Sequence, residues 1–233
     1  MHIEDYAQNS PQYYSGELPA LLEKYLKHDS GGTLLECGCG DGTILHALKE
    51  RGYFTGREIN AVDLSNQRIN LVKNIDQLIK ARIDNAEVLS TVADESIDFA
   101  ISTQVIEHVD DEKMSSALVR VIKTGGFLYL TTVFKKKYGW YFYKNEKGEW
   151  ALDPTHLREY QSDNELLRYF PAEQFIVLEN VKKMQYYPLI DFFIKRFNIR
   201  DRNFFQNNLM RFLRMIKLPI IGYYKWELVL KKK

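Results

Sequence analysis

The chain has 233 residues, of which 45% are hydrophobic and 27% charged, and its formal net charge is +1. This length and composition suit one α/β domain with additions and a sizeable core. No apolar run approaches the roughly 18 residues that a membrane-spanning helix needs, and the polar, acidic start does not resemble a signal peptide, so we expect a cytoplasmic protein.

The first informative element is a glycine-rich segment that follows a short apolar run. Residues 34–35 predict a buried strand that Glu36 closes, and residues 43–50 predict a helix. Glycines at positions 38, 40 and 42 permit a tight turn and let a ligand reach the backbone. An acid before these glycines would repel a pyrophosphate but attract an ammonium group, which favours a ligand with an amino-acid tail. An ordinary turn between a strand and a helix is the alternative.

This segment resembles the first motif of the class I S-adenosylmethionine-dependent methyltransferases, an acid followed by G-x-G-x-G. The resemblance implies S-adenosylmethionine as the cofactor and S-adenosylhomocysteine as the product. Cys37 and Cys39, the only cysteines, lie inside the segment. Without a second pair elsewhere they favour neither a structural disulfide nor a zinc site, which agrees with a reducing compartment.

A second strand is expected at residues 57–63, ending in Asp63. Asp63 follows the glycine turn by about twenty residues, the separation at which an acid holds the ribose hydroxyls in doubly wound sheets. Ser65 is a good N-cap for a helix that starts at Asn66. The alternative role for Asp63 is to cap this same helix.

A third polar cluster follows Ile83. In the methyltransferases that the chain resembles, an acid and a small residue at this place contact the adenine ring, where a carboxylate can accept from the exocyclic amine. The alternative is an Asp-Asn loop turn. Altogether we assign twelve residues to the cofactor site: Glu36, Gly38, Cys39, Gly40, Gly42, Asp63, Leu64, Asp84, Asn85, Ala86, Ser102 and Tyr14.

In residues 96–109, apolar side chains at 97, 99 and 101 alternate as in a central strand. A Glu-His-Val pattern follows at Glu107, His108 and Val109. This pattern resembles the small-molecule branch, type 11, that includes the quinone-biosynthesis enzymes. A helix at 111–123, a glycine stop at 125–126 and a fifth strand at 127–133 should follow. The resemblance thus runs from residue 30 to residue 185 with several motifs in order.

Residues 134–160 predict an aromatic hairpin over the mouth of the pocket. Three lysines at 135–137 precede a run of Tyr, Trp and Phe, residues 145–148 predict a turn, and Trp150 begins the return. The aromatic side chains could stack on an acceptor ring, but we favour packing on one another and on the C-terminal insert.

The C-terminal part begins with a capping box at Ser162 and Glu165, which predicts a helix at 163–169. A sixth strand at 175–184 should run parallel to the first five, so that its carboxyl end points to the cofactor side. The insert 186–222 that follows predicts two short basic amphipathic helices over the substrate pocket.

Charge supports more than one role for this insert. Residues 182–233 hold 13 Lys or Arg and three Asp or Glu, whereas residues 1–181 hold 19 and 28. The insert could serve as a lid or dimer interface, bind an anionic substrate, or contact a membrane surface. A solvated basic face is the remaining alternative.

Methyl transfer requires mainly alignment of the reacting atoms, and a hydroxyl acceptor also benefits from a base. The resemblance points to His108 and His156, with Glu107 in support; the alternatives are a structural helix residue for His108 and a hydrogen-bonding anchor for His156. Some quinone O-methyltransferases bind a divalent metal here through Glu-x-x-Glu-His. This chain has Gln104 at the first position, and an amide is a poorer ligand than a carboxylate, so we predict no metal.

We therefore expect a single methyltransferase domain, 1–233, on an α/β, seven-stranded, mostly parallel, doubly wound (Rossmann-like) sheet with an antiparallel last strand at 223–230. Its cofactor-binding core should span 30–133, with roof insertions at 134–160 and 186–222. The expected reaction is methyl transfer to a small-molecule or glycan-type acceptor, neutral or anionic, more readily at oxygen than at nitrogen. The alternatives are a tRNA or other nucleic-acid methyltransferase and a catalytically inactive cofactor-binding partner. Monomer and homodimer both remain open.

Overall fold

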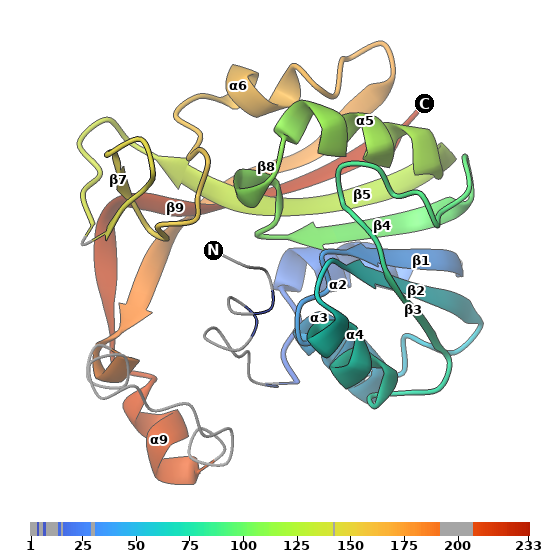
Figure 1. Ribbon diagram of the computed structural model, residues 1–233, viewed down its shortest axis with the longest axis horizontal. Coiled ribbons are helices and arrows are strands. Elements are labelled where there is room, and N and C mark those ends of the chain that lie inside the picture. The colour runs from blue at the N-terminus through green and yellow to red at the C-terminus, as the bar shows by residue number, and fades with distance from the viewer. Residues whose placement is uncertain are drawn as a thin grey trace.

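A seven-stranded sheet with helices on both faces forms the body of the molecule (Figure 1). The computed structural model describes residues 4, 7, 14, 16–28, 31–141, 143–191 and 207–233. Its strands are β1 Gly32–Cys37, β2 Arg57–Asp63, β3 Ile79–Ile83, β4 Ile97–Thr103, β5 Ile122–Lys135, β6 Tyr143–Lys144, β7 Trp150–Ala151, β8 Phe175–Pro188 and β9 Lys217–Lys232. Its helices are α2 Ala20–His28, α3 Thr43–Glu50, α4 Asn66–Lys73, the 3₁₀ turn η1 Ile106–His108, α5 Asp111–Val121, α6 Asp163–Leu167 and α9 Asn208–Leu213.

The strand order is β3-β2-β1-β4-β5-β9-β8, and the first five strands are parallel. Strand β9 pairs antiparallel with both β5 and β8, so β8 runs parallel to the first five. This arrangement confirms the predicted doubly wound sheet with an antiparallel last strand. The order reverses between β1 and β4, the place where open α/β sheets bind their ligands.

Both faces of the central strands β1, β2, β4 and β5 are buried, as is typical of parallel sheets covered by helices. One core cluster joins α5 and α6 to residues such as Leu35, Leu128 and Trp226. The second joins α2, α3 and α4 to Leu34, Phe99 and other residues of the opposite face. In Figure 1, α5 and α6 accordingly lie on one side of the sheet and α3 and α4 on the other.

Two local predictions differ from the structure. Helix α5 ends at Val121, so the glycines at 125–126 do not stop it. Instead, Ile122 already pairs with Ile97, and the register then shifts before Phe99 pairs with Phe127. Residues 123–126 must therefore loop out of β5, and Gly125 takes a φ of 83° there.

The predicted capping box forms only in part. Ser162 is the N-cap of α6, but its hydroxyl donates to the Glu165 carboxylate at 3.0 Å and accepts from no backbone N–H. The other Glu165 oxygen accepts from the Gln161 N–H at 2.9 Å. The reciprocal capping bond is missing at the N-terminus of α6, and the helix ends at Leu167 instead of residue 169.

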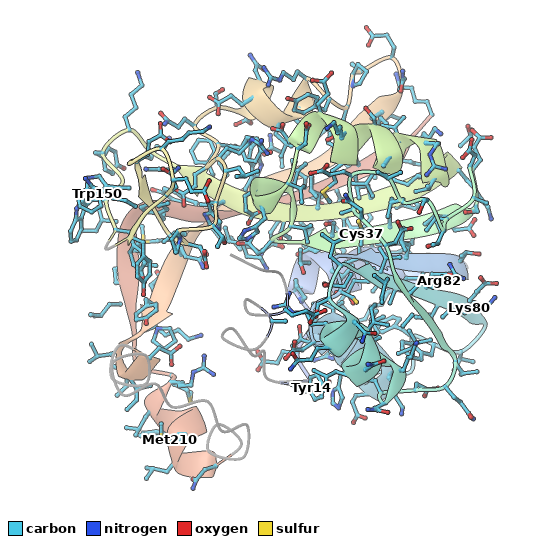
Figure 2. All side chains as sticks on the ribbon, in the orientation of Figure 1. Tyr14, Cys37, Lys80, Arg82, Trp150 and Met210 are labelled. Atoms are coloured by element: carbon cyan, nitrogen blue, oxygen red, sulfur yellow. The ribbon has the colours of Figure 1, made fainter. Side chains whose placement is uncertain are left out.

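The β8–β9 pair is longer than predicted and carries the insert past the body of the sheet. Pairing continues to Pro188 and Lys217, and α9 lies at the far end of this ribbon (Figure 1). Figure 2 shows Met210 of α9 far from Cys37 in the sheet. The first predicted amphipathic helix falls mostly on residues 192–206, outside the described residues. Among the described helices, none combines the length and apolar character needed to cross a membrane.

The aromatic hairpin forms as predicted, with β6 and β7 antiparallel around the turn at 145–148. Its rings pack mainly on one another: Tyr141 meets Tyr143 at a centroid distance of 5.7 Å and Tyr223 of β9 at 6.3 Å. Trp140 and Trp150 meet at 5.7 Å on the outer side. This packing supports the interpretation that the aromatic side chains pack on one another and do not form a platform for an acceptor ring.

Replacing Trp226 with alanine should lower the free energy of unfolding by about 3–5 kcal/mol. Trp226 is fully buried, its ring meets Phe134 at 5.7 Å, and its Nε1–H donates to the Asn180 side chain at 2.7 Å. Urea-induced unfolding measures the change. Leu78→Ala, at a side chain that is 62% exposed, is the control and should change stability by less than about 0.5 kcal/mol. A Trp226→Ala loss below about 1 kcal/mol would contradict the central packing of β9.

Candidate functional site

A cavity of about 820 Å³ opens at the carboxyl ends of β1, β2 and β4, as the strand order predicts. Six of the residues predicted for the cofactor line it: Gly38, Gly40, Asp63, Leu64, Asp84 and Ala86. Both predicted catalytic histidines, His108 and His156, line it as well. The other six predicted cofactor residues lie outside its lining: Glu36, Cys39, Gly42, Asn85, Ser102 and Tyr14.

The glycine loop is held against the end of β2 by backbone hydrogen bonds. The N–H groups of Gly38 and Cys39 both donate to the Val62 carbonyl at 2.9 Å, and the Gly40 N–H donates to the Asp63 carboxylate at 2.9 Å. Gly38 has a φ of 75°, and a Cβ there would lie 2.4 Å from the Val105 side chain. Glycine is thus required at position 38 for both conformation and space.

Asp63 is buried at the end of β2, and each of its oxygens accepts one backbone hydrogen bond. The Ser65 N–H donates to Oδ1 at 2.9 Å, and the Gly40 bond occupies Oδ2. The Ser65 side chain caps α4, as predicted, by accepting from the Arg68 N–H at 3.2 Å. Asp63 therefore does not cap α4, and its carboxylate faces the cavity.

Arg68 is a cavity residue that the sequence analysis missed. Although it is 7% exposed, its guanidinium lies 3.5 Å from the Asp41 carboxylate and 4.0 Å from the Asp63 carboxylate. This one cation therefore compensates two buried acids beside the glycine loop. The available signal was weak: an arginine three residues after a serine N-cap ordinarily faces solvent.

Glu36 lies beneath the glycine loop and does not line the cavity itself. It is 1% exposed, and among the described residues its Oε2 has no hydrogen-bond partner. Burial, followed by the nearby charge of Asp63, raises the pKa of Glu36 well above its ordinary value. A buried carboxyl oxygen without a hydrogen bond is costly, so this group favours a cationic ligand group close to the loop.

Asp84 and Ser102 both make hydrogen bonds within the protein, and their roles toward the cofactor stay predictions. The Asp84 carboxylate accepts from the backbone N–H groups of Asn85, Ser90 and Thr91 and from the hydroxyls of Ser90 and Thr91, at 2.7–3.1 Å. Burial alone would raise the pKa of Asp84, but these bonds hold it below its ordinary value. The oxygens organise the loop, leaving little capacity to accept from adenine. Ser102 is buried and donates to the Cys37 carbonyl at 3.0 Å, a structural role.

Three other predicted residues border the cavity without lining it. The Tyr14 hydroxyl donates to the Asp41 carbonyl at 2.9 Å, and its ring stacks on His46 at 4.4 Å. Asn85 caps its own loop by accepting from the Glu87 N–H at 2.9 Å. Gly42 is the N-cap of α3, with a φ of 82°.

The two histidines meet across the cavity wall, their ring centroids 4.7 Å apart in an edge-on arrangement. His108 comes from η1, and its Nδ1 lies 3.0 Å from the Thr155 hydroxyl, which donates to Asp153 at 2.6 Å. Burial, followed by the charge of His156, lowers the pKa of His108 to about 4. His108 is therefore a neutral imidazole at ordinary pH.

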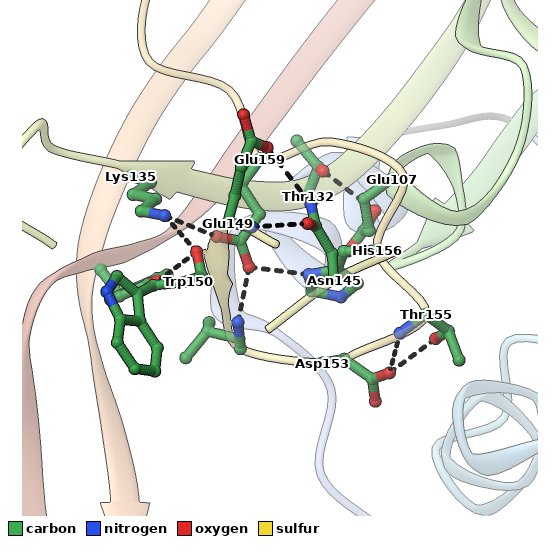
Figure 3. A network of polar contacts seen from close by, with 12 residues as sticks. Glu107, Thr132, Lys135, Asn145, Glu149, Trp150, Asp153, Thr155, His156 and Glu159 are labelled. Atoms are coloured by element: carbon green, nitrogen blue, oxygen red, sulfur yellow. Dashed lines mark hydrogen bonds and ion pairs between the residues drawn. The ribbon is translucent and has the colours of Figure 1, made fainter. Parts of the chain in front are cut away.

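His156 has a different environment, with its Nδ1 2.8 Å from the Glu159 carboxylate (Figure 3). Burial opposes a charge on His156, but Glu159 and Glu107 more than compensate and raise its pKa above the ordinary value. Glu107 is fully buried and accepts from the Thr132 hydroxyl at 2.9 Å; burial raises its pKa to about 7.

The C-terminal end of the loop at 153–158 is tied to η1 and to the start of α5. The Leu157 N–H donates to the Glu107 carbonyl at 2.8 Å. The Arg158 guanidinium donates to the Ile106 carbonyl at 3.2 Å and forms an ion pair with Asp111 at 3.3 Å. These bonds fix the position of His156 relative to His108.

Ligand atoms of Glu107, His108 and His156 lie within 4.8 Å of one another, a spacing that a metal ion could bridge. The polar neighbours of this set already provide partners within the protein, namely Thr132 for Glu107 and Glu159 for His156. The absence of a metal stays a prediction.

The remainder of the lining could not be read from the motifs. From the end of β4 come Thr103, Gln104, Val105 and Val109, and from the hairpin and the loop after it come Lys144, Asn145, Glu146, Asp153, Pro154 and Thr155. Gln104 has a φ of 56°, an uncommon conformation for a residue with a side chain. No described residue of the insert 186–222 lines the cavity, because the β8–β9 ribbon carries residues 186–191 and 207–222 away from it.

Comparison with known proteins agrees with this geometry. The family model described as a methyltransferase domain matches residues 35–130, most of the segment from β1 to β5. A ubiquinone biosynthesis O-methyltransferase of Idiomarina loihiensis is 28% identical over 115 residues, 47% of this chain and 46% of that protein. Phosphoethanolamine N-methyltransferase 1 of Triticum aestivum is 26% identical over 166 residues, 68% of this chain and 30% of that protein. The chain thus spans less than half the length of these curated relatives.

Among solved structures, the YcgJ protein of Bacillus subtilis superimposes with a TM-score of 0.60 at 19% identity, covering 91% of this chain and 97% of that chain. At this identity the likeness concerns the fold. The sheet order, the acid and glycine turn after β1, and the matching family model lead to one conclusion. Residues 35–130 match a methyltransferase domain of the type 11 branch, and the fold and the relatives support a class I S-adenosylmethionine-dependent methyltransferase.

Proposed function

We propose that this protein transfers the methyl group of S-adenosylmethionine to a hydroxyl of a small polar acceptor. One observation carries the proposal: a single cavity joins the glycine loop and Asp63 at one end to His108 and His156 at the other. A cofactor bound at the loop and an acceptor bound at the histidines would share this one cavity. Alignment of two reactants in such a space provides most of what this chemistry needs.

The residues at the loop fit the cofactor. The Asp63 carboxylate can accept from ribose hydroxyls, because each of its oxygens keeps lone-pair capacity beyond one backbone bond. Glu36 supplies a buried carboxyl with an oxygen that lacks a partner among the described residues, which suits an ammonium group nearby. The bound cofactor would supply an electrophilic methyl group. The protein supplies binding, orientation and removal of a proton.

His156 is the stronger candidate for the base that takes the acceptor's proton. The pKa of His156 lies above the ordinary value, whereas burial and the charge of His156 lower the pKa of His108 to about 4. A base is most effective when its pKa is near the working pH, and a group with a pKa near 4 accepts a proton poorly at neutral pH. His108 then serves to orient the acceptor through a neutral ring.

The composition of the cavity favours a polar acceptor. Within the described part of the chain, no Phe, Tyr or Trp lines the cavity. At the histidine end, Lys144, Asn145, Glu146 and Asp153 provide donors and acceptors of both charges. This wall suits an uncharged, hydroxyl-rich molecule of glycan type more than an anionic one or an apolar ring.

The other functions considered from the sequence receive less support. The basic insert does not reach the cavity in the part of the chain that the structure describes, so the site offers no observation in favour of a nucleic-acid acceptor. A cofactor-binding partner without catalysis would bind S-adenosylhomocysteine equally well. A panel of hydroxyl, amine and RNA acceptors with methyl-labelled cofactor separates these functions, and transfer to polyols or sugars supports the proposal.

Asp63→Ala should weaken S-adenosylhomocysteine binding at least about tenfold, because hydrogen bonds to a charged group contribute about 1.5–3 kcal/mol each. Asp63→Asn keeps the size and one acceptor oxygen and should lose less. Calorimetric titration measures both. The control is Asp94→Ala, at a surface carboxylate whose side chain is 71% exposed. Equal affinities in wild type and Asp63→Ala would remove Asp63 from the cofactor site.

His156→Ala should lower kcat by about 10²–10⁴-fold, the usual contribution of a general base, with little change in S-adenosylhomocysteine affinity. His108→Ala should lower kcat less than His156→Ala does. In the wild type, kcat/KM should rise with pH through an apparent pKa above 6.5, since His156 must be deprotonated and its pKa is raised. A larger loss in His108→Ala, or activity that falls with pH over this range, would assign the base to another group.

A further inference from the structure

Glu159 lies behind His156 and does not line the cavity. The side chains of the two residues are 4% and 6% exposed, and the His156 Nδ1 is 2.8 Å from the Glu159 Oε1. Because His156 itself lines the cavity, this carboxylate contacts the ring from the protein side. Figure 3 shows Glu159 within the polar network that surrounds His156.

The hydrogen bonds of Glu159 determine where the proton of His156 resides. The same oxygen, Oε1, accepts from the Leu152 N–H at 2.6 Å, and Oε2 lies 3.6 Å from the Lys135 ammonium. Both oxygens thus face a donor or a cation, and the Lys135 ammonium favours the negatively charged carboxylate. An ionised carboxylate has no hydrogen to give, so the hydrogen shared with His156 must be on Nδ1, and Nε2 carries the lone pair.

We infer that Glu159 is a positioning residue that holds His156 in the Nδ1–H tautomer and turns its basic Nε2 away from the carboxylate, toward the acceptor. The catalytic part of this inference rests on the proposed function. A carboxylate behind a histidine base fixes the tautomer and stabilises the imidazolium that forms when the base takes a proton.

The neighbouring histidine provides an internal comparison. The Nδ1 of His108 faces the Thr155 hydroxyl and reaches Asp153 only through it. A hydroxyl between ring and carboxylate stabilises a charged ring less than direct contact does. His156 therefore has a carboxylate in direct hydrogen-bond contact with its ring.

Two substitutions separate the geometry from the charge. In Glu159→Gln, the amide oxygen can still accept from Leu152 and His156, so the tautomer should persist while the negative charge is lost. In Glu159→Leu, the hydrogen-bond acceptor and the negative charge are both lost. Glu112→Gln, on the exposed side of α5, is the matched control. Long-range ¹⁵N spectra of histidine-labelled protein report the tautomer directly, without any need for an acceptor.

The expected results differ between the variants. Wild type and Glu159→Gln should show His156 protonated on Nδ1, and Glu159→Leu should show a mixture of tautomers. With an acceptor, Glu159→Gln should lower kcat about tenfold and Glu159→Leu by about 10²–10³-fold, both with KM within about twofold.

The pH profile provides a further readout that a merely structural residue would not change. The groups that face His156 are Glu107 and His108 from η1 and Asp153 and Glu159 from its own loop. Of these, only Glu159 changes, so Glu159→Gln should shift the acid limb of kcat/KM to lower pH, because the carboxylate raises the pKa of His156.

The inference is overturned if the wild-type spectrum shows His156 protonated on Nε2, or if Glu159→Leu keeps the wild-type tautomer. If Glu159→Leu does not fold, Glu159→Gln still decides through the pH profile and kcat. Failure of the wild type to bind S-adenosylhomocysteine or to methylate any acceptor would end the proposed function instead, and the tautomer measurement would still stand.

Discussion

Parallel pairing of β1 with both β2 and β4 is the constraint on which the site depends. The register places Cys37 beside Val62 and Glu36 beside Ile101, so three strands end at the same edge of the sheet. The glycine turn, Asp63 and the turn that leads to His108 follow these three ends. Residues far apart in the sequence are thereby held around one cavity before any side chain makes a specific contact. A shift in the register of β1 against β2 or β4 would move these residues apart.

This edge collects negative charge, which a low-dielectric site must compensate. Glu36, Asp41 and Asp63 are each buried near the glycine loop, and Arg68 is the described cation that reaches two of them. Glu36 remains the least compensated, since its Oε2 has no partner among the described residues and burial raises its pKa. The loop therefore gains more from a bound cation than from a bound anion. This electrostatic imbalance explains physically why a cradle built like a dinucleotide site should prefer a ligand with an ammonium group.

The sequence predicted what depends on local chemistry and strand order. The strand before the glycine turn, the strand end at Asp63, the Ser65 cap and the hairpin turn at 145–148 follow from short-range rules. Contacts between distant segments could not be predicted in the same way. Nothing near Asp84 indicated that Ser90 and Thr91 would saturate its carboxylate. The extension of the β8–β9 ribbon likewise depends on cross-strand pairing, so neither its length nor the distance of the insert's described residues from the cavity was evident.

The roles of the two cavity histidines could not be distinguished from the sequence either, for a physical reason. His108 and His156 share one cavity wall, and from the sequence they were equal candidates. What distinguishes them is the partner behind each ring: a hydroxyl for His108 and a carboxylate for His156. Glu159 is only three residues from His156, but this spacing alone does not predict a contact. The contact depends on the folded loop, in which Leu152 and Lys135 hold the carboxylate in place. Two histidines 4.7 Å apart cannot both be protonated cheaply. The Glu159 carboxylate raises the pKa of His156. The positive charge that His156 then carries lowers the pKa of His108.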